Sequence, residues 1–144
     1  RVAGEGKNVR DWRFVEDHAK AIDMVQEQGR LFETYNVGGH NEKQNIEIIN
    51  IIIDTLQEML PADDPRRALV SKDLITYVED RKGHDRRYAI APDKIKAEIG
   101  WYPETDFATG IKKTIAWFFE HEDWMKNVTS GDYQKYYDDM YANK

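Results

Sequence analysis

Residues 41–60 carry the pattern that most restricts how this chain can fold. Isoleucine and leucine recur there at the 3.6-residue spacing of one helix face, and a proline follows at position 61. The stripe consists of Ile46, Ile49, Ile53, Leu56 and Leu60, widened by Ile48, Ile51 and Ile52. Asn41, followed three residues later by Gln44, resembles a capping box, so we expect the helix to begin there. The pattern predicts an amphipathic helix that ends at Pro61.

Weaker patterns lie on either side of this helix, some with the 3.6-residue period of a helix and some with the two-residue period of a strand. In chain order they predict a strand at 9–15, a helix from 16 to Gly29, strands at 34–37, 75–78 and 88–90, a helix from Pro92 to Gly100, and a helix that Thr105 caps. Residues 61–73, with two prolines, are expected to form an exposed loop. The alternation of strands and helices favours an α/β fold, with strands too few and too short for a complete doubly wound sheet.

The bulk composition restricts the classes of function. The 144 residues carry a formal net charge of −6, which argues against general binding to nucleic acid or acidic membranes, because such binding rests on a broad positive field. None of them is cysteine, so disulfides and thiolate chemistry are excluded, and a reducing cytoplasm is compatible. The longest apolar-rich run, 46–53, is too short to span a bilayer. The chain starts at Arg1 without a signal-peptide pattern and looks like a piece of a longer protein.

A cationic turn at residues 80–90 is the most informative segment for function. Its basic residues surround a glycine and a histidine: Arg81, Lys82, Arg86 and Arg87 around Gly83 and His84. Arginine presents a planar fork of donors that suits phosphate oxygens, and glycine lets backbone amides approach a ligand closely. On an acidic chain such a cluster indicates a small anionic ligand. The alternative is a solvated charge run between two strands.

Four separated segments together resemble the C-terminal part of dTDP-glucose 4,6-dehydratases, which belong to the extended short-chain dehydrogenase/reductase family. The segments are 8–12 running on through 15–18, then 34–42, 77–90, and 100–101 with 110–114. The run 80–90 is the most specific of them, and the resemblance covers nearly the whole chain.

The resemblance implies a fold for this chain. It would be the C-terminal portion of an extended short-chain dehydrogenase fold of the NAD-binding Rossmann type, with helices, a few short strands and the N-terminal Rossmann core absent. Residues 1–40 would form a strand–helix–strand unit that completes the Rossmann sheet. Residues 41–144 would form a mostly helical, substrate-binding domain.

The resemblance also implies an activity for the complete protein. Enzymes of this family are lyases that use bound NAD to oxidise dTDP-glucose at C4, eliminate water across C5–C6 and return the hydride to C6, in deoxysugar biosynthesis. The product is dTDP-4-dehydro-6-deoxy-glucose. We therefore expect a cytoplasmic homodimer that binds a dTDP-sugar and neither nucleic acid nor membranes.

The family's cofactor and catalytic motifs are absent from this sequence. It contains no Gly-x-x-Gly-x-x-Gly, and no tyrosine is followed four residues later by lysine. We therefore expect no catalytic, cofactor-binding or metal-binding residue in this chain, and no turnover by the chain alone. Two other functions stay open: a segment of a related UDP- or GDP-sugar dehydratase or epimerase, and a non-catalytic module that binds nucleotide sugars.

The resemblance carries over a set of substrate-binding residues. By position, Arg10 and Asn45 correspond to residues that contact the nucleotide diphosphate, and Tyr141 to a tyrosine that closes over the substrate. The substrate-contacting turn corresponds to Asp80, Arg81, Lys82, Gly83 and His84. Asn45 also lies near a helix N-terminus, where free amides and the helix dipole favour anions.

Each of these assignments has an ordinary alternative. Arg10 could pair with Asp11 or Asp17 at the surface, Asn45 could cap its helix, and Tyr141 could pack in the tail. His84 could bind the substrate or only anchor its turn. Because the other histidines are scattered along the sequence, a metal site at His84 is disfavoured.

Overall fold

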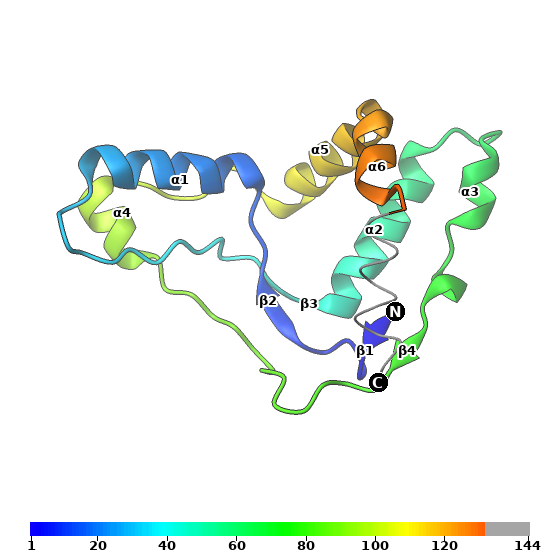
Figure 1. Cartoon of the computed structure of the whole chain (residues 1–144), viewed down its shortest axis with the longest axis horizontal. Coiled ribbons are helices and arrows are strands. Elements are labelled where there is room, and N and C mark those ends of the chain that lie inside the picture. Colours follow the sequence, from blue (N-terminus) through cyan, green and yellow to red (C-terminus); the bar gives the residue numbers. More distant parts are fainter. Residues whose placement is uncertain (132–144) are drawn as a thin grey trace. The chain divides into compact units, whose positions relative to one another are not determined.

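The computed structural model describes residues 1–131 of the chain, which divides into two compact units, 1–111 and 112–144. The elements, shown in Figure 1, are β1 (Val2–Ala3), β2 (Val9–Asp11), α1 (Val15–Gln28), β3 (Glu42–Gln44), α2 (Asn45–Met59), α3 (Pro65–Leu69), the 3₁₀ turn η1 (Lys72–Leu74), β4 (Tyr77–Val78), α4 (Asp93–Ile99), α5 (Phe107–Glu120) and α6 (Glu122–Thr129). The expected mixture of helices with a few short strands is confirmed. None of the helices within residues 1–131 has the length and apolar character that a bilayer crossing needs.

The strands of the first unit form two separate pairs. β1 runs parallel to β4, with Val2 opposite Tyr77, and β2 runs antiparallel to β3, with Val9 opposite Gln44. On its other edge, β2 meets the segment 86–88 through a parallel bridge between Val9 and Arg87. β2 is therefore bonded on both edges, and it fixes the end of the cationic turn.

The core of the first unit lies between α1 and α4, which Figure 1 shows packed side by side. Ala21 is fully buried, and its small side chain lets Ile95 and Ile99 of α4 approach α1 closely. The indole N–H of Trp101 donates to the carbonyl of Asp17 at 3.1 Å, so this large buried side chain leaves no polar atom unpaired.

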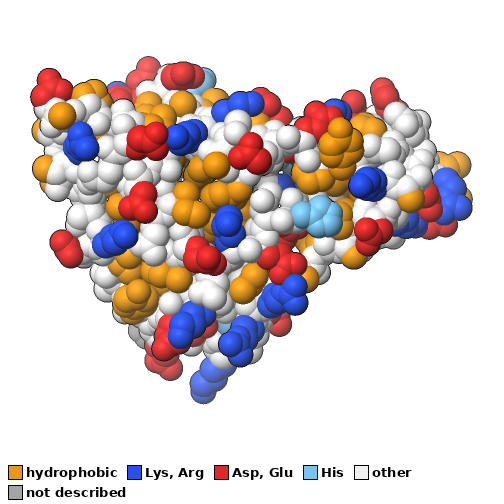
Figure 2. Space-filling model, turned by 180° about the vertical axis from the view of Figure 1, so that it is seen from behind, with side chains coloured by type: hydrophobic (Ala, Val, Ile, Leu, Met, Phe, Trp, Pro, Cys, Tyr) orange, Lys and Arg blue, Asp and Glu red, His pale blue; other side chains and the backbone are white. Residues whose placement is uncertain are grey.

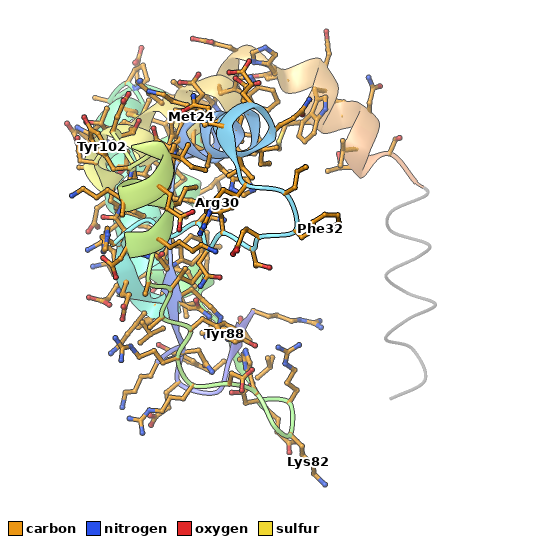
Figure 3. All side chains as sticks on the ribbon, turned by 90° about the vertical axis from the view of Figure 1, so that its left-hand side faces the viewer. Met24, Arg30, Phe32, Lys82, Tyr88 and Tyr102 are labelled. Atoms are coloured by element: carbon orange, nitrogen blue, oxygen red, sulfur yellow. The ribbon has the colours of Figure 1, made fainter. Side chains whose placement is uncertain are left out.

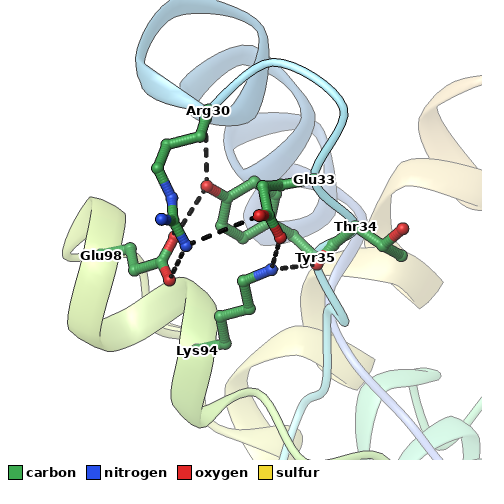
Figure 4. A network of polar contacts seen from close by, with 6 residues as sticks. All are labelled: Arg30, Glu33, Thr34, Tyr35, Lys94 and Glu98. Atoms are coloured by element: carbon green, nitrogen blue, oxygen red, sulfur yellow. Dashed lines mark hydrogen bonds and ion pairs between the residues drawn. The ribbon is translucent and has the colours of Figure 1, made fainter.

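A polar network on the surface ties the loop after α1 to α4 (Figure 4). Arg30 Nη2 lies 2.7 Å from Glu98 Oε1, and the hydroxyl of Tyr35 donates to Glu98 Oε2 at 2.9 Å. Lys94 Nζ lies 2.6 Å from Glu33 Oε2. These contacts hold the chain between α1 and residue 35 against α4, on the side of the unit away from the cationic turn.

An aromatic cluster in the second unit joins α5 to α6. The indole ring of Trp117 stacks on the imidazole of His121, with 4.2 Å between ring centroids, and meets the ring of Trp124 edge-on at 5.2 Å. These contacts stabilise the bend between the two helices. The expected division of the chain at residue 40 concerns the complete protein and stays a prediction.

Four strand predictions were wrong in part or in full. The strand predicted at 75–78 begins only at Tyr77, because Ile75 caps the preceding 3₁₀ turn η1. The strand at 9–15 ends at Asp11, because the Asp11 carboxylate accepts hydrogen bonds from the backbone of the 39–41 turn and the chain then leaves the β3 edge. Residues 34–37 form no strand; Tyr35 and Val37 pack on the α1–α4 core instead. Residues 88–90 form no strand either, and their pairing with β2 stops at the bridge of Arg87.

The helix limits also differ from the predictions at several points. The helix predicted from residue 41 begins at Asn45, because residues 42–44 pair as β3, and the capping box joins Gln44 to Glu47. The predicted loop at 61–73 contains α3 and η1, whose first amides are capped by Asp64 and Ser71. Residue 106, not Thr105, caps α5, as its carboxylate accepts from the backbone N–H of Thr109 at 3.0 Å.

Candidate functional site

The candidate site forms where β2 meets the turn at residues 80–85. Both backbone groups of Val9 are bonded to this region: its N–H donates to Arg86 O at 2.8 Å, and its carbonyl accepts from Tyr88 N at 3.1 Å. The side-chain amide of Asn8 donates to the Asp85 carbonyl at 3.2 Å. Segments more than 70 positions apart in the sequence are thereby fixed beside one another, and Arg10 is brought to the turn.

Arg10 is the centre of the site. Its Nη1 donates to Val9 O at 2.6 Å, and its Nη2 donates to His84 Nε2 at 2.9 Å and to Asp85 O at 3.1 Å. The guanidinium carbon lies 4.3 Å from the centroid of the Tyr88 ring. Three of the five N–H groups thus have partners within residues 1–131, and the two on Nε and Nη1 are left for a ligand.

The surface ion pair considered for Arg10 is not formed. The Asp11 carboxylate accepts from the backbone N–H groups of the 39–41 turn, at 2.5 and 2.9 Å. The Asp17 carboxylate accepts from the backbone N–H of Thr105 at 3.0 Å. Within residues 1–131 no carboxylate neutralises Arg10, so its charge is available to an anion.

His84 and Asp80 continue the site from Arg10 into the turn. His84 Nδ1 lies 2.7 Å from Asp80 Oδ1, which also accepts from the backbone N–H of Arg81 at 2.8 Å. The hydrogen bond with His84, and secondarily the one from Arg81, holds the pKa of Asp80 below its ordinary value. His84 is the less exposed of the pair, with 13% of its side chain accessible.

The outer part of the turn is open to solvent. Gly83 adopts φ +72°, a left-handed conformation that glycine enters without strain, and no atom lies within 4 Å of where a Cβ would be. Lys82 lies at the far end of the turn and points away from the body, whereas Tyr88 lies close to it (Figure 3). Arg81 and Lys82 are exposed, so the structure brings His84 and Asp80 to Arg10 but leaves these two cations at the rim.

Asn45 is linked to the site by a chain of hydrogen bonds. It is the first residue of α2, and its N–H donates to Asn8 O at 3.0 Å. Asn8 in turn donates to the Asp85 carbonyl that Arg10 contacts. The helix cap is Gln44, so the capping alternative for Asn45 was wrong. Tyr141 lies outside the described residues, and its role stays a prediction.

The sequence did not indicate the contributions of Tyr88 and Asp85. The hydroxyl of Tyr88 donates to the Asp85 carboxylate, and this hydrogen bond raises the pKa of Tyr88 above its ordinary value. Tyr88 therefore supplies a neutral ring beneath the Arg10 guanidinium. Its position in the cationic run was the only available signal, because the bridge to β2 that places it depends on long-range pairing.

The surroundings of the site fit a small anion better than a polyanion or a metal. A groove of about 500 Å³ opens beside Arg10, lined among others by Trp12, Val15, His18 and Tyr88. On the face drawn in Figure 2, basic and acidic side chains are interspersed, in keeping with the net charge of −6. Within residues 1–131, no group of three or more histidine or carboxylate side chains is placed to hold a metal ion.

The glycine pair after residue 37 offers no cradle for a dinucleotide. A Cβ on Gly39 would lie 2.8 Å from Trp12 O and 2.9 Å from Arg13 Cβ, and one on Gly38 would lie 3.0 Å from Ile90 O. The chain's own backbone therefore occupies the space that a phosphate would need. Gly38 and Gly39 therefore do not form a phosphate cradle for NAD.

Known proteins resemble this chain over nearly all of its length. The family model described as GDP-mannose 4,6 dehydratase matches residues 1–114. A dTDP-glucose 4,6-dehydratase of Shigella flexneri is 46% identical over 143 residues, which is 99% of this chain and 38% of that protein.

Two solved structures of such proteins superpose on the chain. The dTDP-glucose 4,6-dehydratase of Bacillus anthracis in complex with NAD gives a TM-score of 0.74 at 42% identity, over 89% of this chain and 37% of that one. DesIV, the dTDP-glucose 4,6-dehydratase of Streptomyces venezuelae, with NAD bound, gives 0.73 at 35% identity, over 85% of this chain and 34% of that one. The chain thus spans little more than a third of the length of these relatives.

Proposed function

The chain belongs to the GDP-mannose 4,6-dehydratase family, and from this we propose that it is the substrate-binding, C-terminal segment of a dTDP-glucose 4,6-dehydratase. The observation that carries the proposal is the state of Arg10. Its guanidinium is held by the turn and by Tyr88, has no carboxylate partner within residues 1–131, and keeps two N–H groups for phosphate oxygens.

In the complete enzyme, this segment would bind the dTDP-sugar while the remainder carries out the chemistry. That chemistry is the conversion of dTDP-glucose to dTDP-4-dehydro-6-deoxy-glucose and water with bound NAD. Arg10 would contact the diphosphate, and the turn at 80–84 would form one wall. Asn45 would contact the diphosphate through its side chain, because the first backbone N–H groups of α2 already donate to Asn8, Gly6 and Gln44. Tyr141 would close over the substrate. The cytoplasmic location and the homodimer inferred from the family resemblance belong to the same proposal.

Titration calorimetry of the 144-residue chain with dTDP, UDP and GDP tests the binding proposal. We expect dTDP to bind most tightly, with at least about a tenfold preference over GDP, because the chain is 46% identical to an enzyme described as a dTDP-glucose 4,6-dehydratase. Tighter binding of UDP or GDP would favour the related dehydratases and epimerases instead. Absence of binding by all three diphosphates would contradict the proposal for this chain.

Turnover measurements separate the binding segment from a complete enzyme. We expect no product when the purified chain is incubated with dTDP-glucose and NAD, because the family's Tyr-x-x-x-Lys pair and dinucleotide glycines are absent from the sequence. Mass spectrometry of the nucleotide sugar would detect the loss of one water. Formation of the dehydrated product would contradict this division of roles.

A further inference from the structure

We propose that His84, as a neutral imidazole with its proton on Nδ1, is a positioning residue that orients the Arg10 guanidinium for its anionic ligand. This rests on the proposed function, since the ligand at Arg10 is taken to be a nucleoside diphosphate. His84 would then act through Arg10. Each of its two ring nitrogens has a different partner, and the two partners require different protonation states.

The Nε2 atom of His84 must accept a hydrogen bond. Arg10 Nη2 lies 2.9 Å away, and a guanidinium carries only donors and stays protonated in proteins. The contact is therefore a hydrogen bond only if Nε2 offers a lone pair. A proton on Nε2 would leave two donors facing each other.

The Nδ1 atom then carries the proton and donates to Asp80. The Oδ1 atom of Asp80 lies 2.7 Å from Nδ1 and is also the acceptor for the backbone N–H of Arg81. Because these bonds lower the pKa of Asp80, its carboxylate stays ionised through the neutral range. A carboxylate that orients an imidazole in this way fixes the tautomer through which the other ring nitrogen acts.

The chain Asp80–His84–Arg10 restricts the orientation of the guanidinium. Without the bond to His84, Arg10 would keep only its carbonyl acceptors and the Tyr88 ring, and its orientation would be less restricted.

Two substitutions test the roles of the two ring nitrogens of His84 separately. In His84→Gln, the side-chain oxygen can accept from Arg10 in place of Nε2, but the donor to Asp80 is lost. In His84→Asn, the shorter amide can donate to Asp80 in place of Nδ1, but nothing accepts from Arg10. We expect the Asn variant to bind dTDP about tenfold more weakly than wild type, and the Gln variant to bind within about threefold of wild type, as measured by calorimetry.

The opposite order, with Asn retained and Gln weakened, would show that His84 only anchors the turn and would overturn the proposal. Equal weakening of both variants would indicate that His84 donates directly to the ligand, which also overturns it.

Nitrogen NMR of the unliganded 144-residue chain tests the positioning without any nucleotide. We expect the His84 ring in the Nδ1–H form near neutral pH, and rotation of the Arg10 guanidinium that is slower in wild type and His84→Gln than in His84→Asn. An Nε2–H tautomer, or an Arg10 signal that is the same in all three chains, would overturn the proposal. If the NMR result holds but dTDP does not bind, the proposed function fails and the positioning role stands.

Discussion

Replacement of Arg10 by alanine is expected to weaken dTDP binding by about a hundredfold. The two N–H groups that the structure leaves for a ligand belong to one charged group, and a hydrogen bond from a charged donor contributes roughly 1.5–3 kcal/mol. Their removal also leaves His84 Nε2 without its donor. Titration calorimetry on wild type and Arg10→Ala at the same ionic strength would measure the loss.

Arg86→Ala is the matched control, because it removes the same charge from the segment that pairs with β2. The backbone carbonyl of Arg86 accepts from Val9 N–H and the residue is exposed, so we expect its replacement to change the affinity by less than about threefold. Arg10→Lys should recover only part of the loss, since an ammonium cannot keep the planar contacts to His84, Asp85 and Tyr88. Equal losses for Arg10→Ala and Arg86→Ala would mean that the turn attracts the ligand only by its overall charge.

Replacement of Ile95 by alanine is expected to lower the free energy of unfolding by about 2–5 kcal/mol. Ile95 is fully buried between α1 and α4, where it packs with Ala21, Ile99 and Trp101. Because the surrounding helices can collapse only partly, the loss combines the transfer energy of the removed carbons with the cost of a cavity. Urea unfolding followed by tryptophan fluorescence would measure the change.

Ile22→Ala on α1 is the control for this substitution. The side-chain change is the same, but Ile22 is 56% exposed, and we expect a change within about 0.5 kcal/mol. Similar destabilisation by both variants would place the core of the isolated chain elsewhere than between α1 and α4.

Local signals were sufficient for elements whose limits are set by their own residues. α2 stops before Pro61, and α4 lies between Pro92 and Gly100 as predicted, with Gly100 in the left-handed conformation that ends a helix. The strand expected at 34–37 failed because a strand also requires a partner, and none is available in residues 1–131. Tyr35 and Val37 instead use their apolar surface against the core.

The sequence could predict which residues belong to the candidate site, but not how these residues contact one another. The resemblance supplied Arg10, Asp80 and His84, and the structure brings these three into one chain of hydrogen bonds. Nothing local to β2 indicates that Tyr88 would lie beneath Arg10, because that contact follows from a bridge between distant segments. Lys82 was included because the resemblance places it in the substrate-contacting turn, yet the left-handed Gly83 beside it turns the tip of the loop outward.

The pairing of β2 with the segment 86–88 also determines when the site can assemble during folding. Arg10 and His84 are 74 positions apart, and closing a chain loop of that length costs roughly 4 kcal/mol of entropy. The contact between Asp17 and Trp101, 84 positions apart, closes a second loop that overlaps the first one. Once α1 and α4 have joined, the path along the chain from Arg10 to His84 shortens to about 24 residues, and the entropy cost of closing it falls by about 1 kcal/mol. Formation of the binding site is therefore favoured by burial of Trp101.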